Sequence, residues 1–174
     1  MKIRRATPGD LDRAMQIFEA ARAFMRRTGN DKQWVDGYPK RELILGDILR
    51  GDFFVVEGEG GSLHACFSFI IGEEPSYRQI ENGAWKEDSP YGTIHRLGSD
   101  GALKGVLQGA VEFCQTKISH LRVDTHECNA VMRHQLEKCG FECCGTIYVA
   151  KGHPRLAYEL CGSAQATKPS EDHL

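Results

Sequence analysis

The 174-residue sequence lacks the features that mark several large classes of protein. Its formal net charge is only −2, so no general basic field is present to attract nucleic acid. Its apolar runs are far shorter than the roughly eighteen residues needed to span a bilayer. The basic N-terminus, MKIRRATPGD, also lacks the apolar segment of a secretory signal. We therefore expect neither a nucleic-acid partner nor a membrane partner.

The cysteines do not form the patterns of a disulfide scaffold or a zinc site. There are seven of them, an odd number, and no C-x-x-C pair occurs. Cys139 with Cys143 or Cys144 has the spacing of half a zinc site, but no second pair of this kind exists. We expect reduced thiols, a cytoplasmic protein and no bound metal.

What is present is typical of a single folded domain, with 41% hydrophobic and 26% charged residues. Hydrophobic periodicity predicts strands at 2–6, 53–57, 63–71, 91–97, 121–126, 141–150 and 155–161, and helices at 7–27, 41–50, 103–114 and 129–139. The polar stretch 72–90 is expected to form a loop on the substrate side. We expect the domain to cover residues 1–161 and a disordered tail to cover 162–174. This order of elements predicts one mixed α/β sheet with helices on both faces.

Residues 91–114 are the stretch around which the rest of the chain is organised. A short strand breaks at the sequence Gly-Ser-Asp-Gly, residues 98–101, and a helical pattern begins at Leu103. The first backbone N–H groups of a helix have no partner inside it, and the helix dipole adds partial positive charge there. Such a turn can hold a phosphate or a pyrophosphate.

Segments near both ends and at the centre resemble, in this order, the GNAT superfamily of acyl-CoA-dependent N-acetyltransferases. They read IRRATPGDLDRAMQIFEAAR, IHRLGSDGALKGV and RVDTHECNAVMRHQLEKCGFECCGTIY. Asn129 and the pair Gly140-Phe141 keep the family's N-x(10)-G-F spacing. The resemblance covers residues 1 to about 161. It implies an α/β (α+β) fold with a mixed, mostly antiparallel twisted sheet of about six to seven strands, splayed between strands 91–97 and 121–125, and about four helices on both faces.

The resemblance implies acetyl-CoA as the cofactor, with its pantetheine arm between the two splayed strands. The amide of Leu97 would donate to the thioester carbonyl. The central loop departs from the family pattern Gln/Arg-x-x-Gly-x-Gly/Ala, because residues 102–107 read ALKGVL and only Gly105 is kept. The backbone amides there can still bind an anion and the ammonium of Lys104 can assist them, although a solvated lysine at a helix start is the alternative. The predicted cofactor-binding residues are Leu97, Ser99, Lys104, Gly105, Val106 and Asn129.

Transfer of an acyl group also requires a neutral amine. A lysine-like amine of pKa near 10.4 is neutral in fewer than about one molecule in a thousand at pH 7, whereas an α-amine near 7.8 is neutral in over about a tenth. A general base therefore matters most for the first type of acceptor. The predicted catalytic residues are His95, Asp124 and His126. The alternatives are a structural strand histidine for His95 and capping of the following helix for Asp124 and His126.

The sequence lacks the general acid that is usual in the family. Many members of the family carry a tyrosine seven residues after the conserved asparagine, and this chain has Leu136 there. Either another group protonates the leaving thiolate or the thiolate leaves unassisted. We interpret Tyr148 and Tyr158, the other candidates, as core aromatic residues on strands.

Trp34, Tyr38 and Glu74 are predicted to line the acceptor pocket, although the two aromatic residues could instead anchor a long loop. The sequence thus predicts an acyltransferase that moves an acetyl group from acetyl-CoA to a primary amine of a small molecule or peptide, by direct transfer in a ternary complex. The alternative is a non-catalytic acyl-CoA-binding or regulatory module on the same fold, which the divergent loop and Leu136 would suit. Because members of the family often dimerise, a homodimer is left open.

Overall fold

The structure, a computed structural model, describes residues 1–162, so the predicted disordered tail lies, except for its first residue, outside the described residues. The elements are β1 (Lys2–Arg5), α1 (Leu11–Arg27), α2 (Arg41–Arg50), β2 (Phe53–Glu57), β3 (Leu63–Ile71), β4 (Gly92–Ser99), α3 (Val106–Gln115), β5 (Leu121–Thr125), α4 (Ala130–Lys138), β6 (Glu142–Val149) and β7 (His153–Leu160). Short 3₁₀ turns are η1 (Pro8–Asp10), η2 (Glu59–Gly61), η3 (Pro75–Tyr77) and η4 (Ala150–Gly152).

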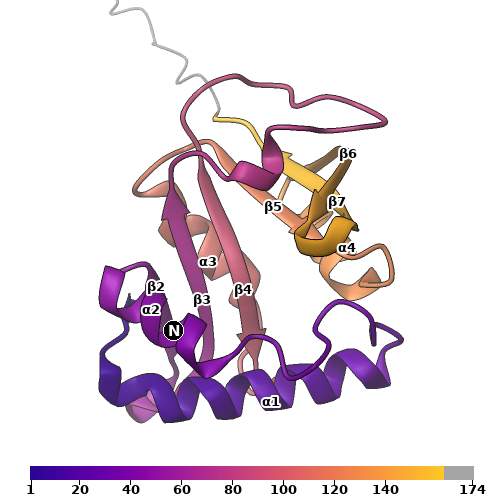
Figure 1. The fold of residues 1–174 in the computed structure, drawn as a ribbon. Helices are drawn as coiled ribbons and strands as arrows, with labels where there is room; N and C mark the ends of the chain where they lie inside the picture. The colour runs from indigo at the N-terminus through magenta and orange to yellow at the C-terminus, as the bar shows by residue number, and fades with distance from the viewer. Residues whose placement is uncertain (163–174) are drawn as a thin grey trace, which may run out of the picture.

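The seven strands form one sheet in the order β1-β2-β3-β4-β5-β7-β6 (Figure 1). Neighbouring strands are antiparallel except β4 and β5, which are parallel. The predicted fold class, a mixed and mostly antiparallel sheet with helices, is therefore confirmed.

Two hydrophobic clusters cover the two faces of the sheet. Alternating side chains of β2 show the division, because Phe53 and Val55 pack in the cluster with α1 and α2, while Phe54 and Val56 pack in the cluster with α3. A third cluster, which includes Tyr77, lies between the loop that joins β3 to β4 and the strands β6 and β7. That loop is therefore the cover of the C-terminal part of the sheet.

The parallel strands β4 and β5 separate soon after they begin. They pair at Gly92 with Leu121 and at Thr93 with Arg122, and then diverge (Figure 1). Further along β4, the register with β3 shifts so that the two residues at 96 and 97 stand opposite Phe67. This arrangement is a β-bulge, which bends a strand away from its neighbour. The predicted splay between these two strands is confirmed.

Two predicted boundaries in the central stretch are wrong. The strand does not break at Gly98 but continues to Ser99, because Gly98 pairs with β3 and fits closely against α1, where an added Cβ would come within 3.0 Å of Phe18. The helix begins at Val106 rather than at Leu103. Gly105 precedes it with a φ of 71°, a left-handed conformation that suits glycine and that a helix interior does not contain.

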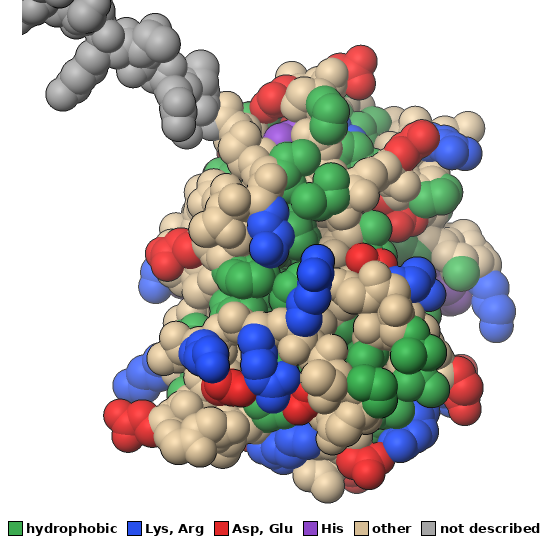
Figure 2. Space-filling view, turned by 90° about the vertical axis from the view of Figure 1, so that its left-hand side faces the viewer, with side chains coloured by type: hydrophobic (Ala, Val, Ile, Leu, Met, Phe, Trp, Pro, Cys, Tyr) green, Lys and Arg blue, Asp and Glu red, His purple; other side chains and the backbone are tan. Residues whose placement is uncertain are grey.

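The surface carries charges of both signs. On the face shown in Figure 2, Lys and Arg side chains are interspersed with Asp and Glu. Among the residues that the structure describes, no helix has the length and apolar character needed to cross a membrane, and no group of three His, Cys, Asp or Glu side chains is arranged to hold a metal ion.

Candidate active site

A cavity of about 640 Å³ lies where β4 and β5 separate. This volume is within the range of roughly 300–1,000 Å³ that is usual for small-molecule sites. Its walls come from β4, β5, α1, the loop between α1 and α2, the first turns of α3 and α4, and the hairpin of β6 and β7. The predicted site residues that line it are Trp34, Tyr38, Glu74, His95, Leu97, Ser99, Asp124 and Asn129.

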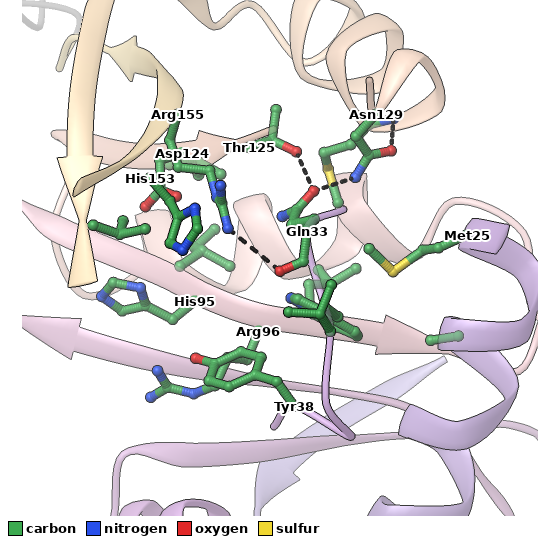
Figure 3. Close-up of a pocket in the computed structure, with 18 of the residues that line it drawn as sticks. Met25, Gln33, Tyr38, His95, Arg96, Asp124, Thr125, Asn129, His153 and Arg155 are labelled. Carbon is green, nitrogen blue, oxygen red and sulfur yellow. Dashed lines mark hydrogen bonds between the residues drawn. The ribbon is translucent and has the colours of Figure 1, made fainter. Parts of the chain in front are cut away.

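Strand alternation explains why polar side chains gather on one side of this cavity. The register of the parallel ladder places His95 and Asp124 on the same face of the sheet. Through the ladder between β5 and β7, Arg155 shares that face with Asp124. Figure 3 shows these three side chains, with His153, directed toward the same part of the pocket. On the opposite face of β5, Leu121 and Val123 pack in the cluster with α3 and α4.

His95 faces a carboxylate. Its Nε2 atom lies 3.4 Å from Oε2 of Glu74. Glu74 is held in turn by Ser76, whose backbone N–H and Oγ donate to Oε1 at 3.2 and 2.9 Å. The hydrogen bond with His95 lowers the pKa of Glu74 to about 2, so this carboxylate is negative at neutral pH. The carboxylate of Glu74 can orient the imidazole ring toward the cavity.

Asp124 is held by a buried tyrosine. The Oη of Tyr77, a residue that is 2% exposed, donates to Oδ2 of Asp124 at 2.7 Å. Burial and the neighbouring Asp124 charge raise the pKa of Tyr77 well above its ordinary value, so the phenol keeps its proton. The backbone of Tyr77 is fixed by Trp85, whose Nε1 donates to its carbonyl at 2.9 Å. Asp124 is therefore presented to the cavity as a positioned anion.

His126 does not line the cavity. Its Nδ1 accepts the backbone N–H of Cys128 at 3.1 Å, in the turn that leads to α4. Burial and then the positive charge of Arg155 lower the pKa of the His126 imidazole. This is the local structural role that the sequence left open for His126. Asn129 has a structural role and also lines the cavity. Its Oδ1 caps α4 by accepting the backbone N–H of Met132 at 3.2 Å.

The far end of the cavity reaches the start of α3. Ser99 lines it there, whereas Lys104, Gly105 and Val106 lie beyond the lining, in the loop and first turn of the helix. The loop is shaped by Asp100, whose carboxylate accepts from Arg13, His64 and the backbone N–H at 102, at 2.6, 3.0 and 3.0 Å. Arg13 offsets the charge of Asp100, and the first backbone amides of a helix, which have no partner inside it, can bind an anion.

Sequence reasoning missed a set of contacts that closes one side of the cavity. Oε1 of Gln33 accepts from Oγ1 of Thr125 at 3.2 Å and from Nδ2 of Asn129 at 3.1 Å (Figure 3). The carbonyl oxygen of Gln33 accepts from Nη2 of Arg155 at 3.3 Å. These bonds join the loop between α1 and α2 to β5, α4 and β7. Because the partners lie between 92 and 122 residues further along the chain, no local sequence signal marks Gln33.

The positions considered for a general acid lie outside the cavity. Leu136 is fully buried. Tyr158 is buried as predicted and also does not line the cavity. The prediction that Tyr148 is a core residue is wrong, because it is 42% exposed on β6 and its hydroxyl donates to Oε2 of Glu81 at 2.9 Å.

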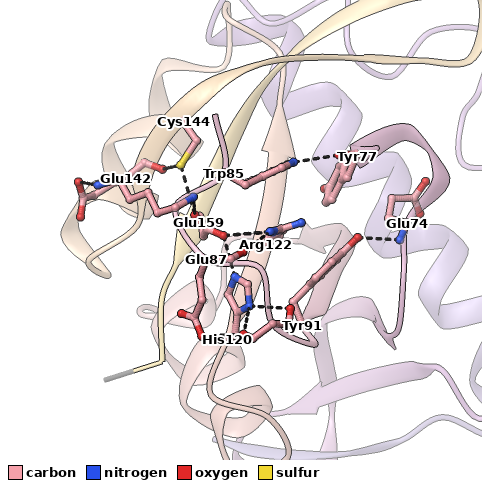
Figure 4. Close-up of polar contacts among 12 residues, drawn as sticks. Glu74, Tyr77, Trp85, Glu87, Tyr91, His120, Arg122, Glu142, Cys144 and Glu159 are labelled. Atoms are coloured by element: carbon pink, nitrogen blue, oxygen red, sulfur yellow. Dashed lines mark hydrogen bonds and ion pairs between the residues drawn. The ribbon is translucent and has the colours of Figure 1, made fainter. Parts of the chain in front are cut away.

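A buried cluster fastens the loop between β3 and β4 (Figure 4). Oε1 of Glu159 accepts from His120 Nε2 at 2.7 Å and from Arg122 Nε at 3.2 Å, and Oε2 accepts from a backbone amide of the loop at 2.7 Å. The guanidinium of Arg122 lies between the rings of Trp85 and Tyr91, at 4.0 and 4.1 Å from their centroids. The loop that carries Glu74 and Tyr77 is thus anchored to β5 and β7.

Comparison with solved structures places this fold among acetyltransferases. An acetyltransferase of the GNAT family from Streptococcus agalactiae matches with a TM-score of 0.81 and 38% sequence identity, over 91% of this chain and 94% of that one. A GNAT-family acetyltransferase from Listeria monocytogenes (TM-score 0.63, 19% identity, 91% and 94% covered) and the ribosomal-protein-S18-alanine N-acetyltransferase from Escherichia coli (0.59, 14%, 99% and 98%) share the fold. No protein-family model and no curated protein matches the sequence. The identity and coverage of the streptococcal match show that the chain belongs to the GNAT family of acetyltransferases.

Proposed function

We propose that the protein is an N-acetyltransferase that moves the acetyl group of acetyl-CoA to a primary amine, by direct transfer in a ternary complex. The observation that carries the proposal is the gap between β4 and β5, which pair only at their first two residues before the cavity opens. Separated strand edges offer backbone N–H and C=O groups to an extended chain of amides. The pantetheine arm of acetyl-CoA is such a chain.

In this proposal, residues at the two ends of the gap bind the cofactor. The amides of Lys104, Gly105 and Val106, with the Lys104 ammonium, would hold the diphosphate at the start of α3. Ser99 and Asn129 line the passage between them and the reaction centre. At the bulge of β4, the Leu97 amide would donate to the thioester carbonyl, an interaction worth on the order of 3 kcal/mol to the barrier. When bound, acetyl-CoA supplies the activated acetyl group.

On the acceptor side, His95 is the proposed general base. Its neutral imidazole takes a proton from the acceptor amine, and Glu74 stabilises the imidazolium that forms. Asp124, held by Tyr77, attracts and positions the amine. The proposal gives no catalytic role to His126, because that imidazole is bound to the turn before α4 and lies outside the cavity. Trp34 and Tyr38 are the proposed apolar walls of the acceptor site.

The thiolate of coenzyme A would leave without a tyrosine at position 136. A free thiol has a pKa of about 8.5, so its anion is a tolerable leaving group near neutral pH. The absent tyrosine and the divergent loop also suit a module that binds acyl-CoA without turning it over. That is the second candidate function, and release of thiol separates the two.

The test is calorimetric titration with acetyl-CoA, followed by a thiol-release assay with amines of high and low pKa. We expect binding and amine-dependent release of thiol. No binding at millimolar acetyl-CoA would overturn the proposal, and binding without thiol release from any amine would support the binding module. His95→Gln should lower kcat/KM for a high-pKa amine by about 100-fold. The matched control is His134→Gln, at an exposed position on α4, which should leave kcat/KM unchanged.

A further inference from the structure

Arg155 is a cation of the cavity wall whose charge no carboxylate of the described residues pairs. Two arginines line the cavity, and Arg96 forms an ion pair with the buried carboxylate of Asp47. Arg155, in contrast, makes no ion pair with any carboxylate of residues 1–162, and its hydrogen bonds go to the backbone carbonyls of Gln33 and Pro154 at 3.3 and 3.0 Å. A guanidinium has five N–H donors, so these two bonds leave capacity for a further acceptor.

Burial makes the lack of an anionic partner for Arg155 costly in free energy. Arg155 is half-buried, and its removal from water lowers its pKa, while the charge of Asp124 acts in the opposite direction. A charge that is taken out of water is stabilised when an opposite charge with hydrogen-bond acceptors is brought to it. A carboxylate is the acceptor that fits a guanidinium best, because two parallel N–H···O bonds can form.

The cavity wall carries charges of both signs. The carboxylate of Glu74 comes from the loop between β3 and β4 and that of Asp124 from β5, whereas Arg155, Lys151 and His153 come from η4 and β7. Figure 3 shows Asp124, His153 and Arg155 close together in the wall. A ligand that carries both an ammonium and a carboxylate can therefore pair with charges of both signs at once.

Arg155 is also on the acceptor side of the sheet. It shares a face with Asp124, whereas the neighbouring residue Val123 points to the other face and packs in the cluster with α3. The start of α3, where a diphosphate fits, belongs to that other face. The charge of Arg155 is thus available to the acceptor rather than to the nucleotide end of acetyl-CoA.

We propose that Arg155 binds a carboxylate of the acceptor, and that the acceptor class is a small zwitterion of the amino-acid type rather than a simple amine or polyamine. This inference rests on the proposed acetyl transfer. Arg155 selects the acceptor by its carboxylate, and the carboxylates of Glu74 and Asp124 receive its amine.

The test compares acceptors that share a side chain and an amine but differ in the carboxylate. The pairs are phenylalanine with phenethylamine, arginine with agmatine, and histidine with histamine, with thiol release expressed per neutral amine. We expect kcat/KM to be at least about 10-fold higher for the carboxylate member of a pair. Arg155→Gln should lower kcat/KM for the carboxylate member by roughly 10- to 100-fold, mainly through a higher KM, and so abolish this preference. It should change kcat/KM for the amine member by less than about 3-fold. The control is Arg26→Gln, at an exposed position on α1.

A second readout does not depend on turnover. The Nε–Hε resonance of Arg155, assigned by its absence in Arg155→Gln, should shift on titration with at least one of the three amino acids and not with the matching amines. Equal use of both members of every pair, or an equal loss for both in Arg155→Gln, would overturn the inference. So would an unshifted resonance with all three amino acids. If acetyl-CoA fails to bind or no amine releases thiol, the proposed function fails, and a shifted resonance still reports the carboxylate site.

Discussion

The substitution Glu159→Gln should destabilise the protein strongly although it keeps the size of the side chain. Glu159 is 1% exposed and is the carboxylate that His120 and Arg122 share. The neutral amide leaves the guanidinium of Arg122, itself 6% exposed, without an anion. Removal of one partner from a buried ion pair costs about 3–5 kcal/mol. Native domains are stable by only about 5–15 kcal/mol, so this is a large share of the total.

The assay is thermal unfolding followed by tryptophan fluorescence and by circular dichroism. For a domain of this size, about 1 kcal/mol shifts the melting temperature by about 2–4 °C, so we expect a decrease of about 6–20 °C. The control is Glu142→Gln on the neighbouring strand. Glu142 is the cross-strand partner of Glu159, but it is exposed and pairs with Lys86 at the surface. The melting temperature of Glu142→Gln should therefore equal that of the wild type within error.

A loss for Glu159→Gln that is no larger than for Glu142→Gln would refute the reasoning that this cluster holds the loop. The double replacement Glu159→Met with Arg122→Met provides a further check. It should cost less than the sum of the two single replacements, because no unpaired charge is left buried.

Two further predictions concern the glycine before α3 and the acid stability of the domain. Gly105→Ala should cost about 1 kcal/mol, because the φ of 71° is strained for alanine, and should weaken acetyl-CoA binding by roughly 10-fold. Gly60→Ala, with a φ of 72° and equally open surroundings, should cost the same stability and leave the calorimetric Kd unchanged; an equal change in Kd would contradict the assignment of the loop. The hydrogen bond from Arg4 lowers the pKa of Asp10 from 3.8 to about 2, so Asp10 stabilises the fold above pH 3.8 by about 2 kcal/mol, and this is lost as the pH falls through about 2. Asp10→Asn should therefore lower the unfolding free energy at pH 6 and flatten its dependence between pH 4 and 2, whereas Asp12→Asn, at an exposed position, should reproduce the wild-type curve.

Local patterns along the chain determined most of the secondary structure. The observed bounds of α2, β2 and β3 are those predicted, because apolar periodicity and the glycines around them are properties of neighbouring residues. The order of the elements, with the spacing from Asn129 to Gly140, also anticipated the family and the splay of β4 from β5. Of the residues predicted for the site, the four that lie on these two strands, His95, Leu97, Ser99 and Asp124, do line the cavity.

Tertiary contacts decided what local patterns could not. The sequence at Gly98 and Ser99 is that of a turn, yet pairing with β3 and contact with Phe18 keep both residues in the strand. His126 and Asp124 are equally plausible bases from the sequence, but β5 ends at Thr125, and the turn before α4 holds His126 outside the cavity that Asp124 lines. Arg155 reaches the site because β7 lies between β5 and β6, an arrangement that brings together residues far apart in the sequence. The sequence determines the chemistry of each side chain, whereas the packing of the whole sheet determines which other groups that side chain contacts.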